Sequence, residues 1–186
     1  MREPVKRLKY FTELLAMKAT GGDISRIARI ASRYKEVINT QLRSHDYNLW
    51  VSIKSGSRKK AKAVLSDIKT RIGLKDCRSL PQLEEFKEMN DEETTKCKSC
   101  LITWNVPIRT VHEIGAQVSN LPEISWCCLR PKLSDFPYNL YTIVNGSTRE
   151  DIISKARKIA KEIGINHHKM LWTEREFNNV STIQTS

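Results

Sequence analysis

The sequence lacks any apolar run long enough to cross a membrane, and no secretory signal follows residues 1–7. It has only seven glycines and six prolines, too few for a collagen-like or low-complexity chain. Its five cysteines are an odd set without the regular spacing of a disulfide framework. We therefore expect a cytosolic, globular protein with free thiols and no membrane partner.

Acidic residues are also scarce relative to basic ones. The chain has 32 lysines and arginines against 21 aspartates and glutamates, a formal net charge of +11. Such an excess favours an anionic partner, which can be nucleic acid, a membrane surface or a carboxylate-rich small molecule. Composition alone does not distinguish among these three kinds of partner.

The sequence repeats itself. A shift of 91 positions superimposes YNLW at 47–50 on YNLY at 138–141, and the register holds for about forty residues. Upstream the shift is 87, which aligns Arg43 with Arg130. The four extra residues of the second copy fall between Arg130 and Tyr138, where a longer hairpin is expected.

Each copy has the pattern of a βαββαβ unit. Apolar residues at helical spacing before Gly73 and Gly164 predict a long helix in each copy, and Thr148 with Asp151 predicts a capping box. A shorter helix is expected over about 24–34, with Asp23 as its cap, and another over about 111–121. Strands are expected over 10–19, 37–43, 47–54 and 77–86, then over 100–106, 124–129, 138–145 and 169–177.

This order predicts an α+β protein of tandem ferredoxin-like (βαββαβ) domains, each a four-stranded antiparallel sheet with both helices on one face. Strand alternation places Trp50, Tyr141 and Ile143 on the helix-free face. We expect the two sheets to pack on each other as an intramolecular pseudo-dimer, or on a second chain in a homo-dimer. The expected domains are 1–89 and 97–186, joined by a polar linker at 90–96.

Both copies resemble a known family. SWCCLRP at 125–131, FPYNLYTIVNG at 136–146 and TEREF at 173–177 resemble the effector, or ligand-binding, domain of the Lrp/AsnC family, and within it the siroheme decarboxylase branch of haem and haem d1 biosynthesis. HDYNLW at 45–50 and the LPxxxxFK pattern at 80–87 resemble the other subunit type of that branch. The family's helix-turn-helix has no counterpart, because the first strand is expected to begin near Tyr10.

The resemblance implies that an anionic tetrapyrrole, such as siroheme or a haem-like molecule, is the ligand or substrate; no other cofactor is implied. Where the branch carries histidines, this chain has Trp126 and Asn145, and Cys128 stands in place of a tyrosine. Indole and amide groups do not titrate near neutral pH, so neither can replace a histidine as a proton donor. The resemblance thus leaves open whether the chain is an enzyme or only binds its ligand.

Several residues are candidates for the site. Arginines at strand ends and helix starts suit bidentate recognition of carboxylates, although a solvated arginine explains each as simply. Among the four histidines only His45, near the expected ligand cleft, is a candidate for acid or axial-ligand duty. The candidate ligand-binding residues are Arg43, Arg58, Trp126, Arg130, Tyr138, Asn145 and Arg149.

Two further motifs, one basic and one rich in cysteine, have simple structural explanations. Residues 55–60 place three cations at the start of a helix, where a bound anion would stabilise them, although plain exposure explains them more simply. Cys97 and Cys100 form a CxxC motif, but Cys127 and Cys128 point to opposite faces of one strand, so no metal site is expected.

These observations favour a small-molecule binding protein of the Lrp/AsnC effector type. The alternatives are a siroheme decarboxylase with fused subunits, with carboxy-lyase activity, and a component of a transcription regulator that acts through a partner. Direct nucleic-acid binding is not expected, because neither YNLWVSIK nor YNLYTIVN has the stacking aromatics of an RNA-recognition strand and no helix-turn-helix is present.

Overall fold

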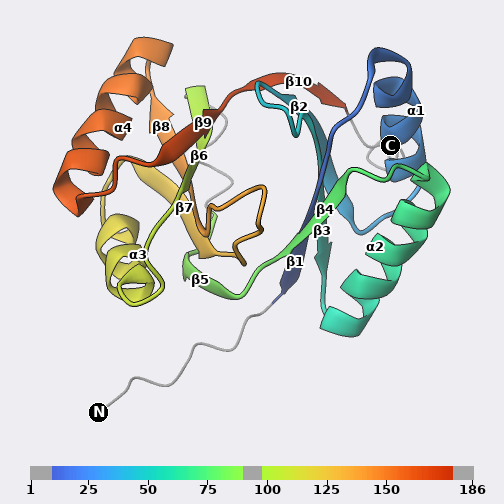
Figure 1. The fold of residues 1–186 in the computed structure, drawn as a ribbon, viewed down its shortest axis with the longest axis horizontal. Helices are drawn as coiled ribbons and strands as arrows, with labels where there is room; N and C mark the ends of the chain where they lie inside the picture. Colours follow the sequence, from blue (N-terminus) through green and yellow to red (C-terminus); the bar gives the residue numbers. More distant parts are fainter. Residues whose placement is uncertain (1–9, 90–97, 178–186) are drawn as a thin grey trace, which may run out of the picture. The chain divides into compact units, whose positions relative to one another are not determined.

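The structure is a computed structural model that describes residues 10–89 and 98–177. The described residues form two compact units, which divide at about Pro81 and again at about Thr173. In each unit an antiparallel sheet carries two helices on one face (Figure 1). The α+β class and the tandem βαββαβ order predicted from the sequence are confirmed.

The first unit contains most of the first sequence copy. Its elements along the chain are β1 (Phe11–Met17), α1 (Gly21–Ala31), β2 (Val37–Arg43), β3 (Leu49–Ser55), α2 (Arg58–Ile72) and β4 (Cys77–Pro81). Its sheet has the order β10-β2-β3-β1-β4 and includes β10 (Thr173–Phe177) from the end of the second copy.

The second unit repeats this arrangement. Its elements are β5 (Glu84–Lys87), β6 (Lys98–Trp104), α3 (Val111–Ser119), β7 (Ile124–Leu129), β8 (Leu140–Gly146), α4 (Arg149–Ile163) and β9 (His168–Leu171). The sheet order is β5-β7-β8-β6-β9. Here the edge strand β5 comes from the end of the first copy.

The two copies therefore exchange their last strands, which the sequence did not reveal. We predicted one strand over 77–86 and one over 169–177, and thus four-stranded sheets; each of these segments is two strands, and each sheet has five. Strand β4 ends at Pro81, which has no backbone N–H to donate to a ladder. Two residues later the Leu83 N–H donates to the Leu129 carbonyl at 2.8 Å, and pairing continues in the other sheet.

Most helix boundaries follow their predicted caps. The Thr148 hydroxyl accepts from the backbone N–H of Asp151, and Gly73 and Gly164 end α2 and α4 with φ of 68° and 67°, as predicted. The Ser57 hydroxyl caps α2 in the same way, by accepting from the Lys60 backbone N–H, although no cap was predicted there. The prediction of Asp23 as a cap was wrong. Helix α1 begins at Gly21, so Asp23 lies in its first turn, where its carboxylate pairs with Arg26 at 2.8 Å.

A second repeated device is an asparagine clamp that closes the end of the first strand in each copy. The side-chain amide of Asn48 exchanges two hydrogen bonds of 2.9 Å with the backbone of Ala19. Asn139 makes the equivalent pair with Val106, at 2.9 and 3.1 Å. These asparagines tie strand to hairpin.

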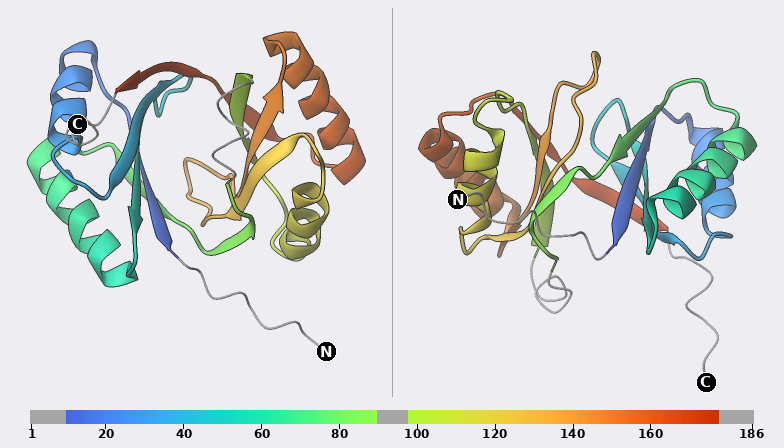
Figure 2. Two further views of the ribbon diagram at one scale, coloured as in Figure 1. Left: turned by 180° about the vertical axis from the view of Figure 1, so that it is seen from behind. Right: turned by 90° about the horizontal axis from the view of Figure 1, so that it is seen from below.

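Each unit has an apolar core between its sheet and its helices. Figure 2 shows the two helices of each unit on one face of its sheet. Trp50 and Tyr141 are buried as well but lie outside these cores, on the helix-free faces of their sheets. Among the described residues, no helix is both long and apolar enough to span a membrane. The predicted linker at 90–96 and Cys97 lie outside the described residues.

Candidate functional site

A β-bulge near the start of β7 determines which side chains reach the helix-free face of the second unit. The register against β8 shifts between Ile124 and Trp126. Ile124 belongs to the core under the helices, and without the bulge Trp126, two residues later, would face the same side. The shift turns Trp126, Cys128 and then Arg130 to the opposite face.

Arg130 is the centre of this cluster. It follows the last residue of β7, and its backbone N–H donates to the Asn139 carbonyl at 2.8 Å. Its guanidinium lies 5.7 Å from the Trp126 ring centre and 5.6 Å from the Tyr141 ring centre. Only 1% of Arg130 is exposed. Arg130 is therefore a buried cation whose guanidinium packs against two aromatic rings.

Two buried hydroxyl groups without a hydrogen-bond partner among the described residues lie in the same cluster as Arg130. Tyr141 and Thr103 face each other across β8 and β6, and both are completely buried. Neither hydroxyl has a hydrogen-bond partner among the described residues. Since buried hydroxyls are nearly always hydrogen-bonded, this pair suits a polar ligand atom or a water molecule.

Burial also controls the protonation of the cluster. It raises the pKa of the Cys128 thiol to about 11, against the lowering effect of Arg130, and it raises that of the Tyr141 phenol further. Both groups are therefore neutral at physiological pH, and Arg130 is the cation among them.

A carboxylate borders the same cluster. Glu85, on the exchanged strand β5, is the partner of Cys128 in the β5–β7 ladder. The Trp126 indole N–H donates to Glu85 Oε1 at 3.1 Å. Glu85 thus fixes the orientation of the ring that covers one side of Arg130.

The first unit repeats this arrangement with different residues. Arg43 ends β2 after an equivalent bulge, and its guanidinium lies 6.0 Å from the Trp50 ring centre. It donates to the side-chain oxygen of Gln41, whose amide in turn donates to Glu176 of strand β10 at 3.4 Å. Arg43 is half-buried and Glu176 is exposed, so this version is the more open one.

The remaining predicted site residues lie elsewhere in their units. Arg58 and Arg149, the first residues of α2 and α4, cover aromatic rings, Phe11 at 5.5 Å and Trp172 at 4.5 Å. Asn145 lies near the far end of β8, where its side-chain oxygen accepts from the Ser125 hydroxyl at 3.5 Å. Of the predicted residues in the second unit, the structure places only Trp126 beside Arg130.

Tyr138 belongs to a separate polar chain. Its hydroxyl lies 3.3 Å from His167 Nε2, and His167 Nδ1 lies 3.0 Å from the Asn105 amide nitrogen. The Asn105 side-chain oxygen accepts a hydrogen bond from Lys132. These contacts tie the longer hairpin of the second copy to the end of β6.

His45 forms part of a tight turn. Its Nδ1 accepts from the Tyr47 backbone N–H at 3.0 Å, and its ring stacks on the Tyr47 ring with 6.3 Å between centres. With Nδ1 engaged as an acceptor, the His45 ring helps to hold this turn.

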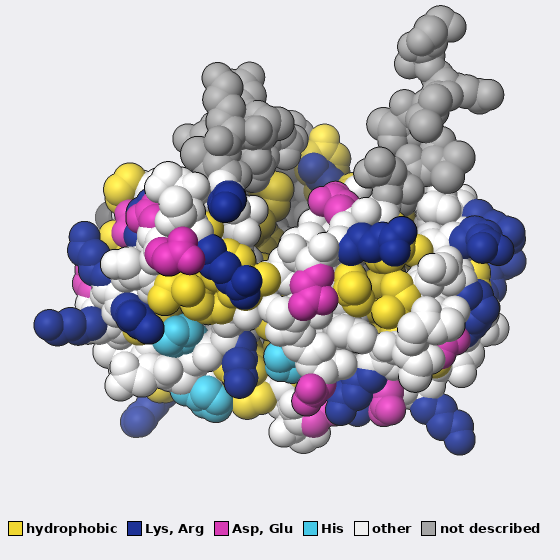
Figure 3. All heavy atoms as spheres, turned by 90° about the horizontal axis from the view of Figure 1, so that it is seen from above, with side chains coloured by type: hydrophobic (Ala, Val, Ile, Leu, Met, Phe, Trp, Pro, Cys, Tyr) yellow, Lys and Arg dark blue, Asp and Glu magenta, His cyan; other side chains and the backbone are white. Residues whose placement is uncertain are grey.

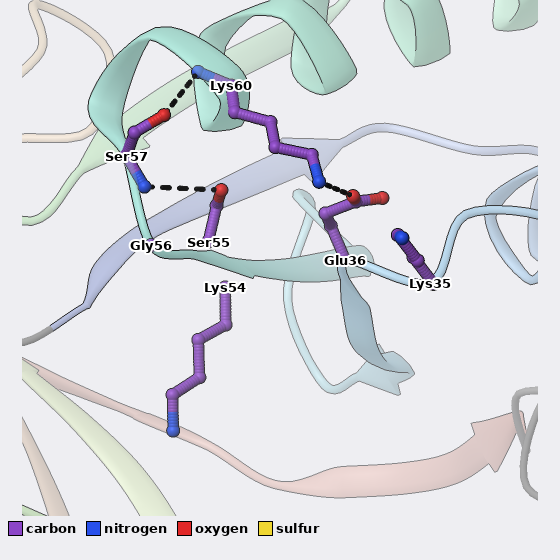
Figure 4. Close-up of a pocket in the computed structure, with 7 residues that line it drawn as sticks. All are labelled: Lys35, Glu36, Lys54, Ser55, Gly56, Ser57 and Lys60. Carbon is purple, nitrogen blue, oxygen red and sulfur yellow. Dashed lines mark hydrogen bonds and ion pairs between the residues drawn. The ribbon is translucent and has the colours of Figure 1, made fainter.

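A cavity of about 430 Å³ lies at the start of α2, separate from the arginine clusters. Figure 4 shows Lys60 turned toward Glu36, with which it forms an ion pair of 2.9 Å, while Lys54 extends away from this pair. The pairing with Lys60 lowers the pKa of Glu36. The Ser57 hydroxyl caps the helix here. Lys60 and Ser57, both at this helix start, therefore have partners within the chain.

The described residues contain no group of three or more histidine, cysteine or acidic side chains placed to hold a metal ion. Cys127 faces α3, where its thiol contacts the Gly115 carbonyl at 3.9 Å, whereas Cys128 faces Arg130, as predicted from strand alternation. On the face shown in Figure 3, lysines and arginines are scattered among acidic and neutral side chains and form no continuous stripe.

Comparison with known proteins adds to this geometry. The sequence model of the AsnC-like ligand binding domain matches the chain twice, at residues 10–87 and 97–178. The beta subunit of siroheme decarboxylase from Methanosarcina barkeri is 35% identical over 79 residues, which are 42% of this chain and 52% of that subunit. The matches to curated relatives thus span about half of their length or less.

Two crystal structures have a similar fold. The siroheme decarboxylase NirDL superimposes with a TM-score of 0.74 at 19% identity, covering 92% of this chain and 73% of that one. The same enzyme in complex with an iron-uroporphyrin III analogue gives a TM-score of 0.71 at 18% identity, with the same coverage. At these identities the similarity establishes the fold alone.

Proposed function

The chain belongs to the AsnC-like ligand binding domain family, with two copies of the domain in tandem, and on this basis we propose that it binds an anionic tetrapyrrole. The observation that carries the proposal is the buried Arg130 guanidinium between the Trp126 and Tyr141 rings. Aromatic faces suit a flat macrocycle, and a buried arginine suits one of its carboxylates. A similar fold binds an iron-uroporphyrin III analogue in NirDL.

The electrostatics of the chain support an anionic ligand. The net charge of +11 raises the local concentration of anions around the protein, and the exposed cations promote association without selecting a ligand. Selection then falls to the buried arginine, because a guanidinium removed from water binds a carboxylate far more tightly than an exposed one.

The test is a titration of the purified protein with iron uroporphyrin III, followed by the Soret band. We expect saturable binding to the wild type, and a loss of about tenfold to a hundredfold in affinity for Arg130→Lys, because lysine cannot form the bidentate contact. Arg157→Lys, which makes the same change at an exposed position of α4, should bind like the wild type. No Soret change with the wild type at micromolar concentrations would refute the proposal.

Siroheme decarboxylation is a second candidate, favoured by the relationship to the Methanosarcina barkeri subunit. In this chain the positions where that branch carries histidine hold Trp126 and Asn145, and burial raises the pKa of both Cys128 and Tyr141 beside Arg130. Anaerobic incubation with siroheme followed by mass analysis separates the two functions. Loss of carbon dioxide would establish an enzyme, and unchanged siroheme with a shifted Soret band would establish binding alone.

A further inference from the structure

The strand exchange brings a glutamate into each arginine cluster from the other sequence copy. Glu85 on β5 contacts Trp126 beside Arg130, and Glu176 on β10 contacts Gln41 beside Arg43. The two glutamates are equivalent in the sequence repeat, and so are the two arginines. Their placement therefore follows from the topology of the exchanged strands.

Glu85 lies in the middle of the row of side chains that ends at Arg130. It pairs with Cys128, and Trp126 and Arg130 flank Cys128 at alternate positions on the same face. Cross-strand neighbours on one face have Cβ atoms about 5 Å apart, and diagonal neighbours about 7–8 Å apart. The charges of Arg130 and Glu85 both act on the Cys128 thiol, the first lowering its pKa and the second raising it.

The charge on Glu85 has a consequence for an anionic ligand. A carboxylate that approaches the Trp126 side of the cluster meets the carboxylate of Glu85, and like charges at short range in a partly buried site repel strongly. A carboxylate at Arg130 itself is attracted by the guanidinium. The cluster thus discriminates among anions by where they carry their charge.

We propose that Glu85 is a specificity-determining residue, which selects against tetrapyrroles that present an additional carboxylate beside Trp126. The inference rests on the proposed function and names the ligands that the same site prefers. Iron coproporphyrin III, which carries half as many carboxylates as iron uroporphyrin III, is favoured by this arrangement.

Glu85→Gln is the informative variant, since it keeps the size of the side chain and the oxygen that accepts from Trp126 but removes the charge. We expect the Kd for iron uroporphyrin III to fall about threefold to tenfold, with the Kd for iron coproporphyrin III changed by less than about twofold. Soret titrations at fixed ionic strength give both values. Glu85→Ala should not reproduce this selective gain, because it also removes the acceptor that orients Trp126.

Glu84→Gln is the matched control, because it makes the same charge change one residue away, where the side chain pairs with His112 at 2.8 Å instead. Glu176→Gln makes the change at the exposed equivalent position and should have a smaller effect. Equal responses of Glu85→Gln and Glu84→Gln, or weaker uroporphyrin binding by Glu85→Gln, would overturn the inference while leaving the proposed function intact. A wild type that binds neither porphyrin would overturn both.

Discussion

At the scale of single residues, equivalent positions in the two copies have different environments. Arg130 is buried between two aromatic rings, whereas Arg43 is half-buried beside one ring and a glutamine. Cys128 and Gln41 occupy the same repeat position, so a buried thiol stands beside Arg130 where the amide of Gln41 stands beside Arg43. The second copy is thus the better candidate for tight recognition of an anion.

Burial of Cys128 predicts a pH dependence of stability. Its pKa is raised by burial from 9.0 to about 11, so the folded protein keeps a proton that the unfolded chain releases. Its contribution is therefore intact below pH 9 and is lost as the pH rises through about 11. We expect the free energy of unfolding, measured with urea, to fall less steeply over this range in Cys128→Ser than in the wild type. If the free energy of unfolding fell equally steeply with pH in the two proteins, the prediction would be contradicted.

At the scale of elements, bulges and exchanged strands position the cluster. The bulge in β7 turns Trp126 away from the helices, and β5 then supplies Glu85 from the first copy. Strand β5 is anchored by Phe86, which packs against α3 at Gly115. A Cβ atom at residue 115 would lie only 2.4 Å from the Phe86 ring, so the close approach requires glycine.

Gly115→Ala tests this anchor. The added methyl group must displace the Phe86 ring, and we expect the free energy of unfolding to fall by about 1–3 kcal/mol. Gly22→Ala in α1 is the control, because a Cβ there meets no atom within 4 Å, and it should cause no loss. Phe86→Ala should cost less in the Gly115→Ala background than in the wild type, as a double-mutant cycle in urea would measure. Strictly additive costs would mean that the two residues do not share this contact.

At the scale of the whole molecule, neither sequence copy contains all the strands of one sheet. Each five-stranded sheet includes an edge strand from the other copy, so the chain passes from one unit to the other at Pro81 and again at Thr173. A break between the copies would leave both sheets incomplete. The two copies are therefore expected to behave as one cooperative structure, while the packing of the two sheets on each other and a homo-dimer stay predictions.

Calorimetry can test this cooperativity. We expect one unfolding transition in which the calorimetric and van't Hoff enthalpies agree, because loss of either sheet releases a strand of the other. Gly115→Ala, although it lies in the second unit, should lower the midpoint of that whole transition. Two separate transitions, with only one of them shifted by the substitution, would show that the units unfold independently.

The sequence alone determined the repeat, the order of elements and most helix ends. These follow from local patterns: apolar spacing sets the period of each element, glycines at positive φ end α2 and α4, and the Thr148 hydroxyl caps the start of α4. Arg130 and Trp126 were also found from sequence, because the motif SWCCLRP places both near the end of one strand.

Tertiary structure decided the rest. The apolar pattern does not reveal the break of two residues after Pro81. From sequence alone, β4 and β5 look like one continuous strand, because the pattern does not show that they pair with different sheets. The bulge in β7 and the placement of Glu85 against Trp126 likewise depend on the neighbouring strand. The sequence determines which side chains each segment carries. Which of them come into contact depends on the pairing of distant strands, because the hydrogen bonds between such strands form only in the folded chain.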